Sequence, residues 1–345
     1  MIVNHTGGLP GRLFHRRMLP VPITLRRSFA VEGNPPETPT RRKPSAAGGS
    51  ELRWNVARSN LVWQSKAILL IVTPVVGVDV ALETQRWAAR SPSVAVSVLG
   101  ASALLGFLTL ILRAATPGAA ATGAAITAGL MYSTAALPFA AWRTALMPIL
   151  AVSLLTFAST RTGRRKKEQL GIAEQRRGRM SAQVAANLGL AALAASDLAR
   201  SWSPQAGELH HAATLPTPIL AAALAALAEA AADTVSSELG QVLGGRPFMI
   251  TSLRRVEPGR DGAVSLAGTL SGIMAAGIVA AVGALALSAG LSVFWISTGS
   301  AVFGLLVDSI LGATLEQRGM LNNDAVNFLS TAAAAMAALM YLKFL

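Results

Sequence analysis

The side chains of this protein that could carry chemistry are carboxylates set in or beside long apolar stretches. Asp233 and Glu238 lie in A-D-T-V-S-S-E-L-G (232–240), directly after a run of alanine and leucine. Glu229 lies four residues before Asp233, so the two would share one face of a helix. Asp308 lies inside another apolar stretch, V-F-G-L-L-V-D-S-I-L-G. An ionised carboxylate in apolar surroundings usually faces a partner or a water-filled cavity, so we interpret both aspartates as site residues. The alternative is that each marks a solvated helix end.

A pair of arginines offers a second kind of chemistry. Arg254 and Arg255 follow I-T-S-L (250–253), so two guanidinium groups lie beside hydroxyl groups. Guanidinium groups bind phosphate through two parallel hydrogen bonds, and the pair therefore indicates a phosphate site. Arginines at a membrane surface also contact lipid headgroups or follow the distribution of positive charge between loops, and that alternative stays open.

Amide and carboxyl side chains gather before the last apolar stretch, at Asn322, Asn323 and Asp324, with Asn327 one turn further along. An Asn or Asp in front of a helix usually caps it. Since capping needs one such residue, the run leaves two side chains for another role.

The residue types that are absent narrow the chemistry. The chain has no cysteine, and its four histidines lie away in sequence from these clusters. It also lacks the phosphate-binding pattern G-x-x-x-x-G-K-[ST]. Carboxylates are the usual protein ligands of Mg²⁺, which substrate phosphates also hold, and arginines stabilise charge during phosphoryl transfer. Beside a membrane, this inventory indicates a phosphorylated lipid and a nucleotide as substrates. It does not distinguish a kinase from a nucleotidyl transferase.

Long apolar stretches must position these side chains. Of the 345 residues, 52% are hydrophobic and 14% are charged, whereas about 25% of the residues of soluble domains are charged. The apolar stretches fall at 67–82, 94–112, 118–138, 144–158, 182–199, 216–232, 263–288, 290–307 and 325–342. About twenty apolar residues span a bilayer as a helix. We therefore predict an all-α, polytopic membrane helix bundle of about nine transmembrane helices, with about eight to ten compatible with the pattern.

The net charge of +13 predicts the orientation of this bundle. Residues 160–180 carry eight Lys and Arg, and such residues accumulate in cytoplasmic loops. With a cytoplasmic N-terminus, the loops at 159–181, 233–262 and 308–324 are all cytoplasmic, and so are the polar clusters. Nucleic acid is the other partner that basic segments suggest, but no binding motif accompanies them, so we expect none.

Residues 1–60 are basic and rich in Pro, Gly and Ser, and we expect a disordered cytoplasmic tail. They resemble an organellar presequence only weakly, so we expect a bacterial inner membrane. A presequence or an over-long start are the alternatives.

Four ordered sequence blocks resemble those of the transmembrane protein 19 family, also called the domain of unknown function 92 family. The blocks are D-T-V-S-S-E-L-G, P-F-M-I-T-S-L-R-R-V-E-P-G-R-D-G, V-D-S-I-L-G-A-T-L-E and N-N-D-A-V-N-F-L-S. G-R-M-S-A-Q-V-A-A-N-L-G (178–189) resembles a further motif of the family. The resemblance covers residues 115–345, which we expect to form a membrane domain with a cytoplasmic polar site. It is weak over 61–114, the first two spans.

The family includes a phytyl-phosphate kinase, so the resemblance implies phosphoryl transfer from a nucleoside triphosphate to phytyl or another polyprenyl phosphate. In this hypothesis Asp233, Glu238 and Asp308 are catalytic and bind Mg²⁺, and Asp324 is a further metal ligand. The remaining residues of the blocks bind substrate or phosphate: Ser237, Arg254, Arg255, Asn322, Asn323 and Asn327.

Other functions stay open beside this hypothesis. A membrane transporter or flippase of unknown substrate is one alternative, and a CTP-dependent lipid nucleotidyl transferase is another. The expected partners are membrane lipids and an isoprenoid phosphate, and the sequence indicates no oligomeric state.

Overall fold

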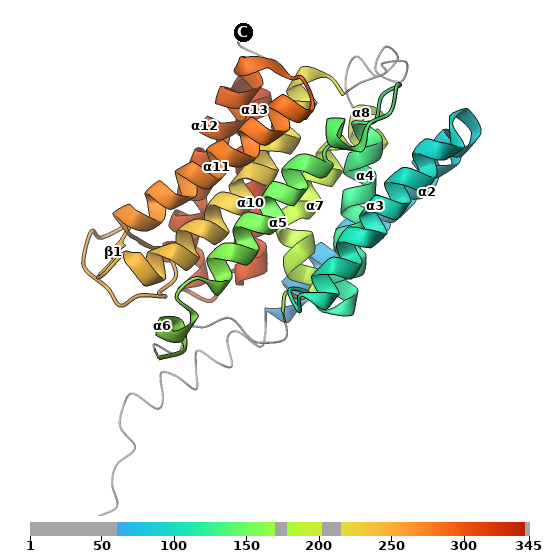
Figure 1. The fold of residues 1–345 in the computed structure, drawn as a ribbon. Helices are drawn as coiled ribbons and strands as arrows, with labels where there is room; N and C mark the ends of the chain where they lie inside the picture. The colour runs from blue at the N-terminus through green and yellow to red at the C-terminus, as the bar shows by residue number, and fades with distance from the viewer. Residues whose placement is uncertain (1–60, 170–177, 202–214, 342–345) are drawn as a thin grey trace, which may run out of the picture. The chain divides into compact units, whose positions relative to one another are not determined.

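The computed structural model describes residues 61–169, 178–201 and 215–341, so the tail expected at 1–60 lies outside the described residues. Within them, most of each predicted apolar stretch is helical (Figure 1), although 118–138 outlasts its helix by five residues and 182–199 is divided between two helices. The helices are α2 (Val62–Arg90), α3 (Pro92–Ile111), α4 (Pro117–Ser133), α5 (Leu146–Arg161), α7 (Ser181–Ala195), α10 (Thr217–Leu243), α11 (Leu266–Ala286), α12 (Gly290–Leu311) and α13 (Asn323–Tyr341). Two short helices, α6 (Arg164–Gln169) and α8 (Asp197–Ser201), a 3₁₀ turn (Ala141–Arg143) and a π-helical turn (Gly312–Glu316) complete the described helical structure.

Five helices of the described chain are long and apolar enough to cross a membrane: α2, α3, α10, α11 and α12 with its π-helical continuation. Two further apolar helices, α5 and α7, are shorter, with 16 and 15 residues. The length and composition of these helices are those of membrane-spanning helices, as predicted. The count of about nine spans stays a prediction.

Helix α10 lies at the centre of the helical unit. The protein buries 78% of its most apolar window, against 28% for α2 and 39% for α11. It contacts α5, α7, α11, α12 and α13. A Cβ atom on Gly272 of α11 would lie 2.9 Å from the carbonyl oxygen of Ala232 in α10. Small residues on both helices therefore permit close packing, which encloses the part of α10 that carries Asp233.

Three helices end four or more residues after the end that the apolar stretches predict. Helix α2 continues to Arg90, α10 continues to Leu243, and α12 continues to Leu311 before its π-helical turn. The predicted ends, at 82, 232 and 307, are the points where charged or polar residues begin. These residues stay helical because many of their side chains find partners inside the protein.

Charged side chains of α2 and α8 illustrate this effect. Asp79 accepts a hydrogen bond from the backbone N–H of Asp197 at 2.9 Å. Arg86 forms ion pairs with Glu83, at 3.1 Å, and with Asp197. Arg200 donates to Glu83 at 3.4 Å. Because the charges of both signs pair with one another, α2 tolerates Asp79 and Glu83 without ending at 82.

The loop between α10 and α11 departs from the all-α prediction. Strand β1 (Phe248–Met249) pairs antiparallel with β2 (Ala263–Val264). Strands of two residues leave no periodic signal in the sequence. Helix α6 lies at the same end of the helical unit (Figure 1), where the Lys166 ammonium group donates to the Val242 carbonyl at 2.6 Å. The basic segment around α6 and the α10–α11 loop therefore share one end.

Candidate functional site

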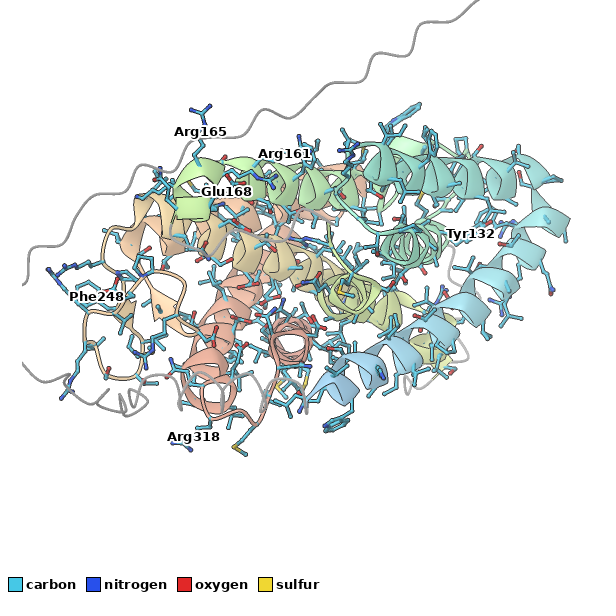
Figure 2. The ribbon with its side chains drawn as sticks, turned by 90° about the horizontal axis from the view of Figure 1, so that it is seen from below. Tyr132, Arg161, Arg165, Glu168, Phe248 and Arg318 are labelled. Atoms are coloured by element: carbon cyan, nitrogen blue, oxygen red, sulfur yellow. The ribbon has the colours of Figure 1, made fainter. Side chains whose placement is uncertain are left out.

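A polar cavity of about 390 Å³ opens at this end of the helical unit. Its walls come from the start of α7, the last turns of α10, the end of α12, the start of α13 and the loop that carries β2. Figure 2, a view from below, labels Arg161, Arg165 and Glu168 on α5 and α6, and Phe248 on the hairpin at the left. Elements far apart in the sequence thus converge on one polar space. The predicted site residues that line it are Asp233, Ser237, Glu238, Asp308, Asn323 and Asn327.

Two carboxyl groups meet in this cavity. Asp233 of α10 and Asp308 of α12 both line it, and their side chains interact with each other. The Oδ2 atom of Asp308 is buried and receives no hydrogen bond from the described residues. Two facing carboxylates with an unsatisfied oxygen repel one another unless a proton or a cation lies between them. The sequence predicted that these two residues would lie in one polar site, and both line this cavity.

Glu229 lies behind the pair as a third, fully enclosed carboxyl group. It is one helical turn before Asp233, its residue is 1% exposed, and its Oε1 atom has no hydrogen-bond partner among the described residues. Ser330 of α13 interacts with the side chains of both Glu229 and Asp308. The sequence prediction left Glu229 out of the site, although its spacing of four residues from Asp233 was the available signal.

A glycine of α12 makes room for Glu229. A Cβ atom on Gly304 would lie 2.7 Å from the Glu229 Cγ atom and 2.8 Å from the Ser330 carbonyl oxygen. Real Cβ atoms essentially never approach so closely. Gly304 therefore lets α12 bring Asp308 against α10.

Glu238 lines the cavity but is already paired. Its carboxylate forms an ion pair with Lys167 of α6, whose side chain is 2% exposed. Lys167 also donates to the Ser159 carbonyl at 3.0 Å. The ion pair between Glu238 and Lys167 joins α10 to α6. The sequence predicted Glu238 as a metal ligand and did not predict this contact.

The predicted arginines lie elsewhere. Arg254 and Arg255 are exposed on the α10–α11 loop and do not line the cavity. The Arg255 guanidinium stacks over the Phe248 ring, 5.6 Å from its centroid, and the Arg254 carbonyl accepts from Met249 at 2.9 Å. Both residues hold the hairpin together.

Two other arginines line the cavity instead, Arg179 and Arg260. Arg179 donates to the Thr234 hydroxyl at 3.2 Å and acts electrostatically on Asp233. The signal for these arginines lay in the family blocks, since Arg179 belongs to the motif at 178–189 and Arg260 to the block that holds Arg254.

The asparagine cluster divides into two parts. Asn322 caps α13, because its side-chain oxygen accepts from the Ala325 N–H at 2.9 Å, and its amide donates to the Leu61 carbonyl at 2.8 Å. Asp324 accepts from the Ser65 hydroxyl at 2.5 Å. Both therefore fasten α13 to α2, and neither lines the cavity.

The other part of the cluster faces the cavity. Asn323 and Asn327 line it, and the Asn327 amide donates to the Asn187 side-chain oxygen at 3.0 Å. Asn187 of α7 lines the same cavity. One amide pair thus connects the walls formed by α7 and α13.

The side chains that could act as metal ligands limit which ions the cavity can bind. Within the described residues, no three His, Cys, Asp or Glu side chains group as metal ligands. Mg²⁺ is commonly bound through one or two carboxylates together with substrate phosphates and water. Asp233 and Asp308 fit that pattern, because both line the cavity and the Asp308 Oδ2 atom receives no hydrogen bond from the described residues. Asp324 does not fit, since it points to α2.

The chain is similar to a known protein family and to individual membrane proteins. The family described as integral membrane protein DUF92 matches residues 100–335. An uncharacterized membrane protein of Synechocystis sp. is 33% identical over 191 residues, which are 55% of this chain and 70% of the relative. An uncharacterized membrane protein of Methanocaldococcus jannaschii is 35% identical over 108 residues, 31% of this chain and 45% of the relative.

A plant relative is more distant. The protein named VTE6, chloroplastic, of Arabidopsis thaliana is 26% identical over 205 residues, 57% of this chain and 58% of the relative. The chain thus covers less than two thirds of the archaeal and plant relatives. No solved structure matches it.

Proposed function

Because this chain belongs to the DUF92 family of integral membrane proteins, we propose that its polar cavity phosphorylates an isoprenoid phosphate. The donor is a nucleoside triphosphate and the lipid product is a diphosphate. The observation that carries the proposal is the meeting of Asp233 and Asp308, from different helices, in a polar cavity of about 390 Å³. The isoprenoid substrate rests on the resemblance of the sequence blocks to a family that includes a phytyl-phosphate kinase.

The reaction needs positioning more than a base. An oxygen of the lipid phosphate, already anionic, bonds to the γ-phosphorus of the nucleotide. The bond from that phosphorus to the oxygen bridging the β- and γ-phosphates breaks, and its electron pair leaves with the nucleoside diphosphate. Arg179 and Arg260 line the cavity and would bind phosphate oxygens and stabilise the charge that develops on them.

The carboxylates would hold the metal. Asp233 and Asp308 supply the oxygens, and bound Mg²⁺ would neutralise and orient the triphosphate. Ser237, Asn323 and Asn327 face the same cavity and can form hydrogen bonds with substrate oxygens. In this proposal Glu238 is a positioning residue, because Lys167 already pairs with it.

The same proposal predicts the side of the membrane on which the cavity opens. Nucleoside triphosphates are cytoplasmic, and positively charged loops stay in the cytoplasm. The basic α6 and the α10–α11 loop lie at the cavity end of the helical unit (Figure 1). We therefore propose that the cavity lies at the cytoplasmic face, with the N-terminus on the same side. The bacterial inner membrane stays the expectation from the sequence.

Purified protein tests the reaction directly. It is incubated with Mg²⁺, CTP or ATP, and geranylgeranyl phosphate, and the lipid product is identified by mass spectrometry. We expect geranylgeranyl diphosphate, and we expect Asp233→Asn and Asp308→Asn to lower its formation by about 10²-fold or more. Glu257→Gln is the matched control, because Glu257 is exposed on the α10–α11 loop and does not line the cavity.

The products separate the alternatives. A nucleotide-linked lipid with release of pyrophosphate would identify a nucleotidyl transferase using the same site. Solute movement in proteoliposomes without nucleotide turnover would identify a transporter. Undiminished phosphoryl transfer in both aspartate variants would show that the metal assignment is wrong.

A further inference from the structure

A second cavity, of about 180 Å³, lies between α3, α4, α5 and α7. Its interior walls are mainly small or apolar side chains from these helices, among them Leu105, Ala120, Ile149, Val152 and Leu188. Hydroxyl groups such as Thr127 and Thr156 also line it, and each of these two donates to a backbone carbonyl of its own helix. The hydroxyl hydrogens of these two residues are therefore already bonded within their helices, and most of the interior wall is apolar.

One end of this apolar cavity is strongly basic. Five cationic side chains line it: Arg113, Arg161, Arg164, Lys167 and Arg179. They come from the loop after α3, from the end of α5, from α6 and from the loop before α7. Figure 2 shows Arg161 at this end of α5. Lys167 is paired with Glu238, and Arg164 is paired with Glu168 at 3.0 Å. Arg113, Arg161 and Arg179 supply the further positive charge, and no Asp or Glu lines the same cavity within the described residues, so this end is complementary to an anion.

The apolar and polar cavities meet at two residues. Arg179 and Asn187 line both of them. The Arg179 guanidinium donates to Thr234, which lines the polar cavity, and Asn187 is hydrogen-bonded to Asn327, which lines it too. A ligand with its anionic head at Arg179 could therefore extend an apolar tail between α4 and α5 while its head faces Asp233.

We propose that the apolar cavity is the binding site for the hydrocarbon chain of a phosphate-bearing lipid, whose phosphate is bound at Arg179. The chain site follows from the apolar walls, the basic mouth and the shared residues. The identity of the head as the group phosphorylated rests on the proposed function. Transfer of the chain from water to this cavity buries apolar surface, and the head at Arg179 then lies at a residue that also lines the cavity of Asp233 and Asp308.

Photo-crosslinking of the unmodified protein tests the location. The probe is geranylgeranyl phosphate that carries a diazirine at the far end of its chain, and labelled peptides are identified by mass spectrometry without any nucleotide. We expect labelling on α4 and α5 that excess geranylgeranyl phosphate suppresses and that excess geranylgeraniol suppresses less. Labelling confined to the exposed faces of α11 and α12, or equal suppression by the alcohol, would overturn the proposal.

A matched pair of variants tests the role of the space. Gly123 of α4 lines the cavity, and a Cβ atom there meets only Val184, at 3.7 Å, so Gly123→Leu can fill the cavity. Gly100 of α3 has no atom within 4 Å of such a Cβ, so Gly100→Leu adds the same side chain on an exposed surface. We expect Gly123→Leu to weaken probe labelling by about tenfold or more, with Gly100→Leu unchanged.

The two proposals fail separately. Specific labelling of α4 and α5 without lipid diphosphate formation would leave the chain site standing and reject the kinase activity. Diphosphate formation from geranylgeranyl phosphate that Gly123→Leu does not impair, with labelling elsewhere, would reject the chain site and leave the kinase activity.

Discussion

Gly304 sets the distance between α12 and the buried Glu229. Because a Cβ atom on Gly304 would lie 2.7 Å from Glu229 and 2.8 Å from the Ser330 carbonyl, we expect Gly304→Ala to lower the free energy of unfolding by about 1–3 kcal/mol. The shift should also separate Asp308 from Asp233 and reduce activity. Thermal unfolding of the detergent-solubilised protein measures the change in stability.

The control for this prediction lies on the same helix. Gly299 has no atom within 4 Å of an added Cβ, so Gly299→Ala should leave the unfolding midpoint nearly unchanged. Equal midpoints for both variants would mean that α12 does not pack against Glu229 as described.

Variants of Glu238 and its partner Lys167 test whether Glu238 is a positioning residue or a metal ligand. Its partner Lys167 is 2% exposed at the side chain, and Glu238 is 15% exposed. Removing one member of such a pair leaves a buried charge and costs about 3–5 kcal/mol. We therefore expect Lys167→Met to destabilise the protein and the double variant Lys167→Met/Glu238→Gln to recover part of the loss, measured by thermal unfolding.

Activity provides the second readout for this pair. If Glu238 acts through Lys167 and α6, the double variant should retain measurable phosphoryl transfer and the same Mg²⁺ dependence as the wild type. A double variant that is stable but completely inactive would instead support the metal-binding role predicted from the sequence.

At the scale of elements, Asn322 joins the start of α13 to the start of α2. Asn322→Ala removes the cap at Ala325 and the hydrogen bonds to Leu61 and Ser65, which together should cost about 1–3 kcal/mol. Asn322→Ser keeps a side-chain acceptor for the cap and should cost roughly half as much. Unfolding midpoints of the two variants measure the difference. Loss of activity at unchanged stability would instead support the substrate-binding role that the sequence predicted for Asn322.

The positions of the helices could be predicted from the sequence, but several of their ends could not. Apolar stretches predicted the helical segments because a helix in lipid satisfies its own backbone. Helix α2 runs past 82 because Glu83 pairs with Arg86 and Arg200. Arg86 is three residues away in the sequence, but Arg200 is 117 residues away and could not be identified as a partner before folding. Strands β1 and β2 are too short to produce a pattern.

At the scale of the whole molecule, the convergence of distant segments was partly predictable. Asp233 and Asp308 could be brought together by the charge rule, which places both at one membrane face. The same reasoning could not tell Arg254, which serves the hairpin, from Arg179, which lines the cavity. Both are basic residues at the same face, and the difference depends on which way each side chain points after packing.

The orientation of the molecule gives a final prediction. Since the chain has no cysteine, single cysteines report accessibility without background. Ser252 is exposed on the α10–α11 loop, and Ala136 is exposed after the C-terminal end of α4. The N-terminal end of α4 lies at the cavity end, where the backbone N–H of Thr116 donates to the Arg179 backbone carbonyl at 3.0 Å. A helix of 17 residues is about 25 Å long, so Ala136 lies far from that end.

We therefore expect opposite labelling in intact bacterial cells that express the two variants. A membrane-impermeant maleimide should label Ala136→Cys directly and Ser252→Cys only after permeabilisation, because the basic cavity end stays in the cytoplasm. Labelling both variants in permeabilised cells controls for accessibility. The reverse pattern would place the cavity outside, where cytoplasmic nucleoside triphosphate cannot reach it, and would remove the kinase proposal with it.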